Sequence, residues 1–464
     1  MRQPPIRRRC RARNACTRPS SAYNPLLFQD PEQTAPVSEP ASPAKRIAFV
    51  STRISGTDGV SLEIAKWAAV LERMGHECFY IAGQCDDRPP ERCHVIPEAH
   101  FTHPAIAEIN RRGFGVQVRP PEVSDRIREM TAVIDAKLRA GLERFQIDIL
   151  IAENCLTIPM NIPLGLALVE TIMETGIGCI AHHHDFVWER DRFMVNALDD
   201  CIQAAFPPHL QEIHHVTINS VAAAELSRRT GLPCRVIPNV MDFAKPPPAC
   251  TVAQDFRRAI GLGDDDRLIL QPTRVVQRKG IETAIELVRR LDDPRCKLVI
   301  THGATDEGDD YARRVRSYAD LLGVELIFAE DRICDPPTPG PDGRPRFSIW
   351  DAYQAADFVT YPSTYEGFGN AFLEAVYCRQ PILCNRYAIY RMDIEPCGFD
   401  VVLMDGYLTD AVVEQVRGVM DDDARRAAMV EHNYRVAREF FSYDRVEGEL
   451  QALLNKPRLA ITHL

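Results

Sequence analysis

Short apolar runs alternate with longer amphipathic stretches along most of the chain. Runs such as 46–50 (RIAFV) and 148–152 (DILIA) have the length and composition of buried strands. The segments between such runs, for example 61–74 and 125–145, repeat their apolar positions at helical spacing. Strands that alternate with helices indicate parallel sheets with helices on both faces. We therefore expect an α/β protein built from doubly wound, Rossmann-like domains.

Composition divides the chain into four parts. Residues 1–44 are rich in Arg, Pro and Ser, so we expect a disordered extension, although an Arg-rich, acid-poor start is also typical of a transit peptide. The run 245–248 (KPPP) is typical of a stiff linker. We accordingly predict an extension at 1–44, an N-terminal Rossmann-like domain at 45–243, a C-terminal Rossmann-like domain at 244–440 and a C-terminal helix at 441–464.

Charge and cysteine content narrow the class of protein. A chain of 464 residues is long enough for two domains, and its net charge of −10 argues against nucleic acid as a partner. The 15 Cys include no C-x-x-C pair, which argues against a disulfide framework or a zinc knuckle. No apolar run approaches the ~18 residues of a membrane span. These features indicate a cytoplasmic protein.

A glycine loop between a strand and a helix carries the strongest chemical signal. Gly367 and Gly369 let the backbone come close to a ligand, and the helix that follows offers free N–H groups to an anion such as phosphate. Glu366 and Glu374 flank the helix start, and ionised carboxylates accept hydrogen bonds from sugar hydroxyls. Together these residues indicate a nucleotide-sugar site. The alternative is that both Glu residues merely favour a helix N-terminus.

The run E-G-F-G-N-A-F-L-E at 366–374 resembles the E-x7-E motif of the retaining glycosyltransferases of family 4 (glycosyl transferases group 1), which have the GT-B fold. The resemblance implies that Glu366 contacts the donor sugar and Glu374 the ribose. It places the first domain on the acceptor side and the second on the donor side of a cleft, with the C-terminal helix crossing back to the first domain. The loop residues implied as donor contacts are Gly367, Phe368, Gly369 and Asn370.

A second motif of that family lies at the end of the strand 268–272. Arg274 and Lys279 match its R-x4-K pattern, although Thr273 stands where the family often has glycine. Two cations there would neutralise the diphosphate as its bond to the sugar breaks. Isolated basic residues are more often solvated, so this inference depends on the E-x7-E run downstream.

The first strand leads into another glycine loop, at 51–59. Its glycines do not form a G-x-G-x-x-G pattern, so a plain turn from strand to helix is an equal alternative. The resemblance places this loop under the donor phosphate, which nominates Gly56 and Gly59 as donor-binding residues.

Three adjacent histidines end the strand that begins at Cys179. His182 and His184 would share one face of the strand and could start a metal site. No carboxylate or Cys stands at a familiar ligand spacing, so we expect no metal. Family members similarly carry His-Asp at this strand end, which implies a catalytic role for His184 at the donor sugar with Asp185 as its orienter.

Residues around the same strand end could hold an acceptor. Trp188 offers a sugar face, and arginines offer charge for a carboxylate or phosphate. A solvated charged loop is an equal alternative. The candidate acceptor-binding residues are Arg53, Asn154, Asp185, Trp188, Arg190 and Arg192.

These motifs predict a retaining hexosyltransferase that uses a nucleotide-diphosphate sugar and a small sugar acceptor, with no cofactor and no essential metal. The pattern W-D-A-Y…Y-P-S-x-Y-E-G-F-G-N is similar to that of transferases that make compatible solutes such as mannosylglucosylglycerate, which favours GDP-mannose and an anionic acceptor such as glucosylglycerate. The alternatives are a sugar phosphorylase, a nucleotide-sugar epimerase or a non-catalytic nucleotide-sugar-binding module.

Overall fold

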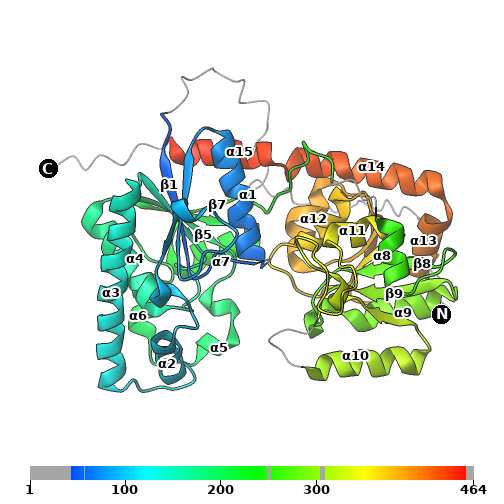
Figure 1. Ribbon diagram of the computed structural model, residues 1–464, viewed down its shortest axis with the longest axis horizontal. Coiled ribbons are helices and arrows are strands. Elements are labelled where there is room, and N and C mark those ends of the chain that lie inside the picture. The colour runs from blue at the N-terminus through cyan, green and yellow to red at the C-terminus, as the bar shows by residue number, and fades with distance from the viewer. Residues whose placement is uncertain (1–42, 57, 248–251, 304–308, 456–464) are drawn as a thin grey trace, which may run out of the picture.

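The chain forms two parallel sheets that lie side by side, each covered by helices (Figure 1). The computed structural model describes residues 43–56, 58–247, 252–303 and 309–455. Strands and helices alternate in both halves, as the apolar runs of the sequence predict. The prediction of two doubly wound α/β domains is therefore confirmed. The predicted extension at 1–44 lies almost wholly outside the described residues.

The first sheet has the strand order β3-β2-β1-β4-β5-β6-β7, and all its neighbouring strands are parallel. Its strands are β1 (Arg46–Ser51), β2 (Glu77–Ala82), β3 (Cys93–Val95), β4 (Ile149–Glu153), β5 (Gly178–His183), β6 (Ile213–Thr217) and β7 (Cys234–Val236). Its helices are α1 (Gly59–Arg73), α2 (Pro104–Gly113), α3 (Pro121–Phe145), α4 (Ile162–Thr175), α5 (Asp191–Met194), α6 (Asp199–Ala205) and α7 (Ser220–Thr230). The order changes direction between β1 and β4, where open α/β sheets bind their ligands.

The second sheet has the order β10-β9-β8-β11-β12-β13 and is also parallel throughout. Its strands are β8 (Arg267–Gln271), β9 (Cys296–Ile300), β10 (Leu326–Phe328), β11 (Phe358–Tyr361), β12 (Ile382–Asn385) and β13 (Val402–Met404). Its helices are α8 (Ala253–Ala259), α9 (Ile281–Leu291), α10 (Asp309–Leu322), α11 (Ile349–Ala355), α12 (Asn370–Tyr377) and α13 (Asp410–Asp421). Here the direction changes between β8 and β11, beside the glycine loop.

Two C-terminal helices run along one side of both domains (Figure 1). The first, α14 (Asp423–Phe440), packs on α12, and the second, α15 (Tyr443–Leu454), packs on α1. Val446 and Leu450 of α15 are fully buried in the same apolar cluster as Trp67 of α1. The end of the chain therefore contributes to the core of the first domain.

Direct hydrogen bonds also join the two domains. The N–H of Ser220, at the start of α7, donates to Asp393 Oδ2 at 2.7 Å, and the Ser220 hydroxyl donates to Asp393 Oδ1. Asn219 Nδ2 donates to the carbonyl oxygen of Gly367 at 2.7 Å. A carboxylate from the second domain thus satisfies a free N–H at a helix N-terminus of the first.

Two helices begin elsewhere than the apolar spacing predicts. The helix α3 starts at Pro121 rather than at 125, since Pro fits the first turn of a helix, where its missing N–H costs nothing. The helix α1 starts at Gly59 rather than at 61, because Asp58 caps it by accepting the N–H of Val60 at 3.1 Å. Among the described residues, no helix has both the length and the apolar character needed to cross a membrane.

Candidate active site

The glycine loops of the two domains approach each other where α1 and α12 begin. Asn239, after β7, donates from Nδ2 to Asn370 Oδ1 at 2.7 Å. A Cβ on Gly59 would lie 3.8 Å from Asn370 Nδ2. Two helix N-termini with their partial positive charges therefore face one region, which favours an anion.

The loop before α12 requires its second glycine. Gly369 has φ +130°, and a Cβ there would lie 2.3 Å from Tyr387 Oη. That hydroxyl donates to the carbonyl oxygen of Phe368 at 2.7 Å and so fixes the loop. The Phe368 side chain is buried in the core against Phe441, so any contact with a donor must come from its main chain.

An ion pair stands at the start of the same loop. Lys279 Nζ contacts Glu366, and Arg278 Nη1 lies 3.0 Å from Glu366 Oε2. Lys279 and Glu366 are both buried, so their charges are poorly screened by water. Burial would raise the pKa of Glu366, but the charges of Lys279 and Arg278 outweigh it and hold that pKa below its usual value. Glu366 is therefore an ionised hydrogen-bond acceptor at neutral pH.

Arg274 contributes a further positive charge beside this pair. Burial and the charges of Lys279 and Arg274 lower the pKa of His302 to about 4, so that imidazole is neutral at neutral pH. The sequence predicts Arg274 and Lys279 as a pair; the structure brings Lys279 into contact with Glu366, and the charge of Arg274 acts on Lys279. The structure adds Arg278 and His302, which sequence reasoning missed; the basic run R-K-G at 278–280 was the available signal for Arg278.

Glu374 lies farther along α12, where a tyrosine contacts its carboxylate. Tyr353 Oη donates to Glu374 Oε2 at 2.9 Å, which orients the carboxylate. Burial raises the pKa of Glu374, and the Tyr353 hydrogen bond and the charges of Lys66 and Lys279 oppose this effect only in part. The two carboxylates of the E-x7-E run therefore have different surroundings, one paired with cations and one held by a phenol.

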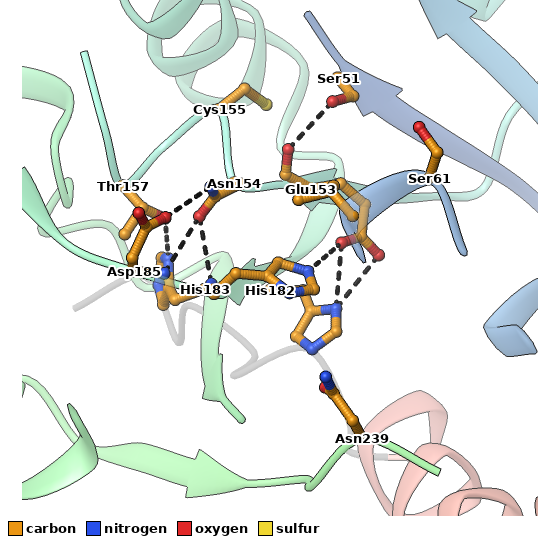
Figure 2. A network of polar contacts seen from close by, with 12 residues as sticks. Ser51, Ser61, Glu153, Asn154, Cys155, Thr157, His182, His183, Asp185 and Asn239 are labelled. Atoms are coloured by element: carbon orange, nitrogen blue, oxygen red, sulfur yellow. Dashed lines mark hydrogen bonds and ion pairs between the residues drawn. The ribbon is translucent and has the colours of Figure 1, made fainter. Parts of the chain in front are cut away.

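In the first domain, a carboxylate stands between two of the three adjacent histidines. Glu153 Oε2, at the end of β4, lies 3.0 Å from His182 Nδ1 and 3.1 Å from His184 Nε2 (Figure 2). Burial would raise the pKa of Glu153, but the charges and hydrogen bonds of the two histidines outweigh it and hold that pKa at about 2. No carboxylate stands at a familiar ligand spacing along the chain, but Glu153 reaches these histidines from the neighbouring strand, a contact that sequence spacing does not reveal.

Asp185 has a different partner from the one expected. Its Oδ1 accepts a hydrogen bond from Asn154 Nδ2 at 2.8 Å (Figure 2). Its Oδ2 is paired with Arg190. The Asn154 side chain also accepts the backbone N–H of His184 at 3.1 Å. The prediction that Asp185 orients the His184 ring is therefore wrong, since Glu153 holds that ring.

The remaining acceptor candidates do not form one cluster. Arg53 lies 3.1 Å from Asp58, the residue that caps α1, and Gly56 makes the left-handed turn of that loop with φ +73°. Trp188 stacks on Phe186 at 4.5 Å, with the Arg229 guanidinium over its ring, and so packs the loop. The Arg192 guanidinium lies over the Phe193 ring. The structure thus brings Asn154, Asp185 and Arg190 together and leaves Arg53, Trp188 and Arg192 in separate contacts.

Comparison with known proteins identifies the family. A sequence model of the glycosyl transferases group 1 matches residues 342–436, which include the glycine loop and the E-x7-E run. The mannosylglucosylglycerate synthase of Petrotoga mobilis is 34% identical over 385 residues, covering 77% of this chain and 86% of that protein. The chain belongs to the glycosyl transferases group 1. It is therefore a glycosyltransferase.

Further similarity covers nearly the whole glycosyltransferase. The mannosylglucosylglycerate synthase of Thermotoga maritima is 29% identical over 439 residues, which cover 87% of this chain and 98% of that protein. The structure of sucrose-phosphate synthase from Thermosynechococcus elongatus matches with a TM-score of 0.60 at 14% sequence identity, covering 89% of this glycosyltransferase and 98% of that chain. This likeness supports the GT-B fold.

Proposed function

We propose that this glycosyltransferase transfers mannose, with retention of configuration, from GDP-mannose to a small anionic sugar acceptor of the glucosylglycerate type. Two relatives that match over most of their length are named mannosylglucosylglycerate synthase. The observation that carries the proposal is the buried Lys279–Glu366 pair beside the α12 glycine loop. This pair sets a cation for a diphosphate next to a carboxylate for sugar hydroxyls.

The donor would lie along the start of α12. The N–H groups of residues 367–370 and the end of the α12 dipole would hold the diphosphate, with Gly56 and Gly59 forming the opposite wall. Glu366 would orient the sugar hydroxyls, and Glu374, held by Tyr353, would accept a hydrogen bond from the ribose.

Cationic side chains would stabilise the leaving diphosphate. Lys279 and Arg278 contact Glu366, and the charge of Arg274 acts on Lys279. Negative charge that develops on the diphosphate would be compensated by these cations. These side chains, together with the helix end, supply the charge that a divalent cation provides in other transferases. The proposal therefore includes no essential metal.

The transfer step would take place on one face of the sugar. The bond from the anomeric carbon to the phosphate oxygen breaks, and the acceptor hydroxyl oxygen forms a bond to that carbon on the same face. The hydroxyl proton passes to the departing phosphate oxygen. Retention follows because the new bond occupies the side that the old bond left.

The acceptor would bind beside β4 and β5. Arg190 is about half exposed and is paired with Asp185, which Asn154 orients. A carboxylate or phosphate on the acceptor would compete with Asp185 for this guanidinium, whose planar donors suit either group. Arg53 and Arg192 would extend the positive surface of this side.

A donor panel tests the proposal. Nucleotide release would be measured from GDP-mannose, UDP-glucose, ADP-glucose and UDP-GlcNAc, with and without small sugar acids and sugar phosphates. We expect release from GDP-mannose that an anionic acceptor increases and that Glu366→Ala abolishes. Lys297→Ala, which removes a lysine paired with Glu325 on the second sheet, serves as the matched control.

Other products would contradict the proposal. Release of free sugar phosphate would indicate a phosphorylase, and conversion of the donor without an acceptor would indicate an epimerase. Donor binding without turnover under every acceptor would indicate a binding module. Turnover with another nucleotide sugar would still indicate a transferase but would contradict GDP-mannose as the donor.

A further inference from the structure

The Glu153 carboxylate is held rigidly beside His184. Glu153 and His182 are partners in the register of β4 and β5, and each is 1% exposed. The His182 ring stacks on Trp67 of α1 with ring centroids 4.1 Å apart. The backbone N–H of His184 donates to Asn154 Oδ1, so the chain at His184 is also fixed. The contact between Glu153 and His184 is therefore built into the first sheet.

The hydrogen-bond partners assign the protons in this cluster. An ionised carboxylate accepts hydrogen bonds, so the two nitrogens that face it, His182 Nδ1 and His184 Nε2, both carry hydrogen. Burial lowers the pKa of His182, which makes that ring neutral, with a lone pair on Nε2 that meets no partner in the described part of the chain. One negative charge then remains beside His184.

We propose that Glu153 is a positioning residue that, with His182, holds His184 as an imidazolium whose second N–H binds an oxygen of the sugar substrate. The identity of that ligand rests on the proposed function. The charge on His184 does not, because it follows from the carboxylate at 3.1 Å. An N–H on a charged ring makes a stronger hydrogen bond than an N–H on a neutral one.

The other charged groups around His184 act in the same direction. Burial lowers the pKa of His184, but the hydrogen bond and charge of Glu153, and then the charges of Glu63 and Asp185, raise it above the ordinary value. Glu63 comes from α1 and is paired with Lys66 at 2.6 Å. On the facing loop, a Cβ on Gly367 would lie 3.6 Å from the His184 carbonyl oxygen.

The residue next to Gly367 on that loop is Glu366, which is neutralised by Lys279 and Arg278. The carboxylates whose charges act on His184 are thus Glu153, Glu63 and Asp185. Glu63 and Asp185 are each paired with a cation of their own. Glu153 is the carboxylate whose negative charge His184 balances.

A proton accounts for this cluster better than a metal ion does. Two imidazoles and a carboxylate are donor types found around zinc. A histidine that binds zinc usually donates from its other ring nitrogen to a partner, and His182 Nε2 has no such partner among the residues that the structure describes. One proton on His184 satisfies the charge of Glu153 at the observed distances.

Histidine titration by NMR tests the proposal without any assay of turnover. In the metal-free full chain, the imidazole resonances would be assigned by the loss of one signal in His184→Gln. We expect His184 in the wild type to stay protonated to a higher pH than an ordinary histidine, and Glu153→Gln to move its titration to lower pH. Glu153→Asp, which keeps the charge, would restore part of the shift. An unchanged His184 titration in Glu153→Gln, or one equivalent of bound zinc in the purified chain, would overturn the proposal.

The pH dependence of kcat/KM provides a second readout once a donor is established. We expect the alkaline limb to move to lower pH in Glu153→Gln, with a loss on the order of tenfold at pH 8 and a smaller loss at pH 6. A loss that is equal at all pH values would indicate a merely structural role and would overturn the proposal. Glu98→Gln, which removes another partly buried carboxylate of the first domain, controls for general damage. Failure of every donor would count against the proposed function and would leave the NMR result standing.

Discussion

The second domain builds its part of the active site from residues close together in the chain, whereas the first domain builds its part from separate strands. Glu366, the glycines and Glu374 all lie within nine residues of one strand–loop–helix unit. Glu153 ends β4 and His184 directly follows β5, and they meet because these two strands pair. Charge also differs between the domains, since cations dominate at Glu366 and carboxylates dominate at His184.

This difference suggests a division of labour. The cations of the second domain face a ligand that carries negative charge, so their loss should act mainly on turnover. The carboxylate–imidazole cluster of the first domain is deeply buried, so its loss should act on stability and on pH dependence as well. Substitutions in the two domains can break or sharpen this contrast.

The largest effect is expected for Lys279→Ala. Removal of a buried cation that stabilises developing charge lowers kcat by on the order of 10²- to 10³-fold. Glu366 keeps Arg278 at 3.0 Å, so we expect a smaller effect on stability than on turnover. Steady-state kinetics with saturating donor, together with thermal unfolding, would measure both.

Lys297→Ala should leave kcat unchanged, because this lysine is paired with Glu325 on the surface side of the second sheet. A Lys279→Ala variant with normal turnover would remove the cationic role from the mechanism. If Lys279→Ala unfolded, the contrast between the domains would fail, because the second domain would then depend on the Lys279–Glu366 pair for its stability.

The next effect concerns the stability of the first domain. The folded pKa of Glu153 lies below its unfolded value of 4.5, at about 2, so its contribution is present above pH 4.5 and lost as pH falls toward 2. The folded pKa of His184 lies above its unfolded value of 6.5, so its contribution is present below pH 6.5 and lost as pH rises through the folded value. The pair is thus strongest between pH 4.5 and 6.5, and the acid limb corresponds to about 3 kcal/mol.

Chemical denaturation of wild type and Glu153→Gln across the pH range would measure this window. We expect the difference in unfolding free energy to be largest between pH 4.5 and 6.5 and to shrink on both sides. Glu98→Gln is the matched control, because burial would raise the pKa of Glu98 but its Lys137 partner outweighs burial and lowers it. The difference in unfolding free energy between wild type and Glu98→Gln should shrink only at acid pH, since lysine does not titrate near neutrality. A Glu153→Gln difference that is flat across pH would contradict the ion pair.

The sequence predicted the glycine loop and the start of α12 in the second domain, and the reason is local. A glycine that must adopt φ +130° and a helix start lie beside each other in the chain, so the loop can be predicted from spacing alone. Arg278 was missed because three basic or polar residues in a row give no sign that two of them, Arg278 and Lys279, contact Glu366. Their direction depends on the turn at Gly280, which has φ +62° and lies against Pro362.

The first half could be predicted only in part. The strand end with its histidines was found, but Glu153 is 29 residues before His182, and nothing in that separation reveals the register that pairs them. The adjacent Asp185 was taken as the partner of His184, because neighbours in sequence suggest contact. In the structure, Asp185 contacts Asn154 and Arg190 instead. The partner of His184 is therefore set by the pairing of strands rather than by adjacency in the sequence.

A smaller effect is expected for Arg190→Ala. Loss of one charge-assisted hydrogen bond to an anionic acceptor costs about 2 kcal/mol, which raises the KM for the acceptor by roughly 30-fold. The KM for the donor should not change, because Arg190 is paired with Asp185 at the acceptor side. Bisubstrate kinetics with an anionic and a neutral acceptor would separate the two, and equal loss with both acceptors would contradict an anion contact.

The smallest effect tests the second carboxylate of the E-x7-E run. Tyr353→Phe removes the hydroxyl that donates to Glu374 at 2.9 Å, and the ring keeps its place in the core. Loss of this hydrogen bond costs about 1 kcal/mol and should raise the KM for the donor roughly fivefold, with kcat nearly unchanged, since the ribose is remote from the breaking bond. Tyr387→Phe is the informative companion, because its hydroxyl holds the Phe368 carbonyl of the glycine loop. A change in kcat for Tyr387→Phe but not for Tyr353→Phe would show that the glycine loop, rather than Glu374, positions the diphosphate. A change in kcat for Tyr353→Phe but not for Tyr387→Phe would assign that role to Glu374.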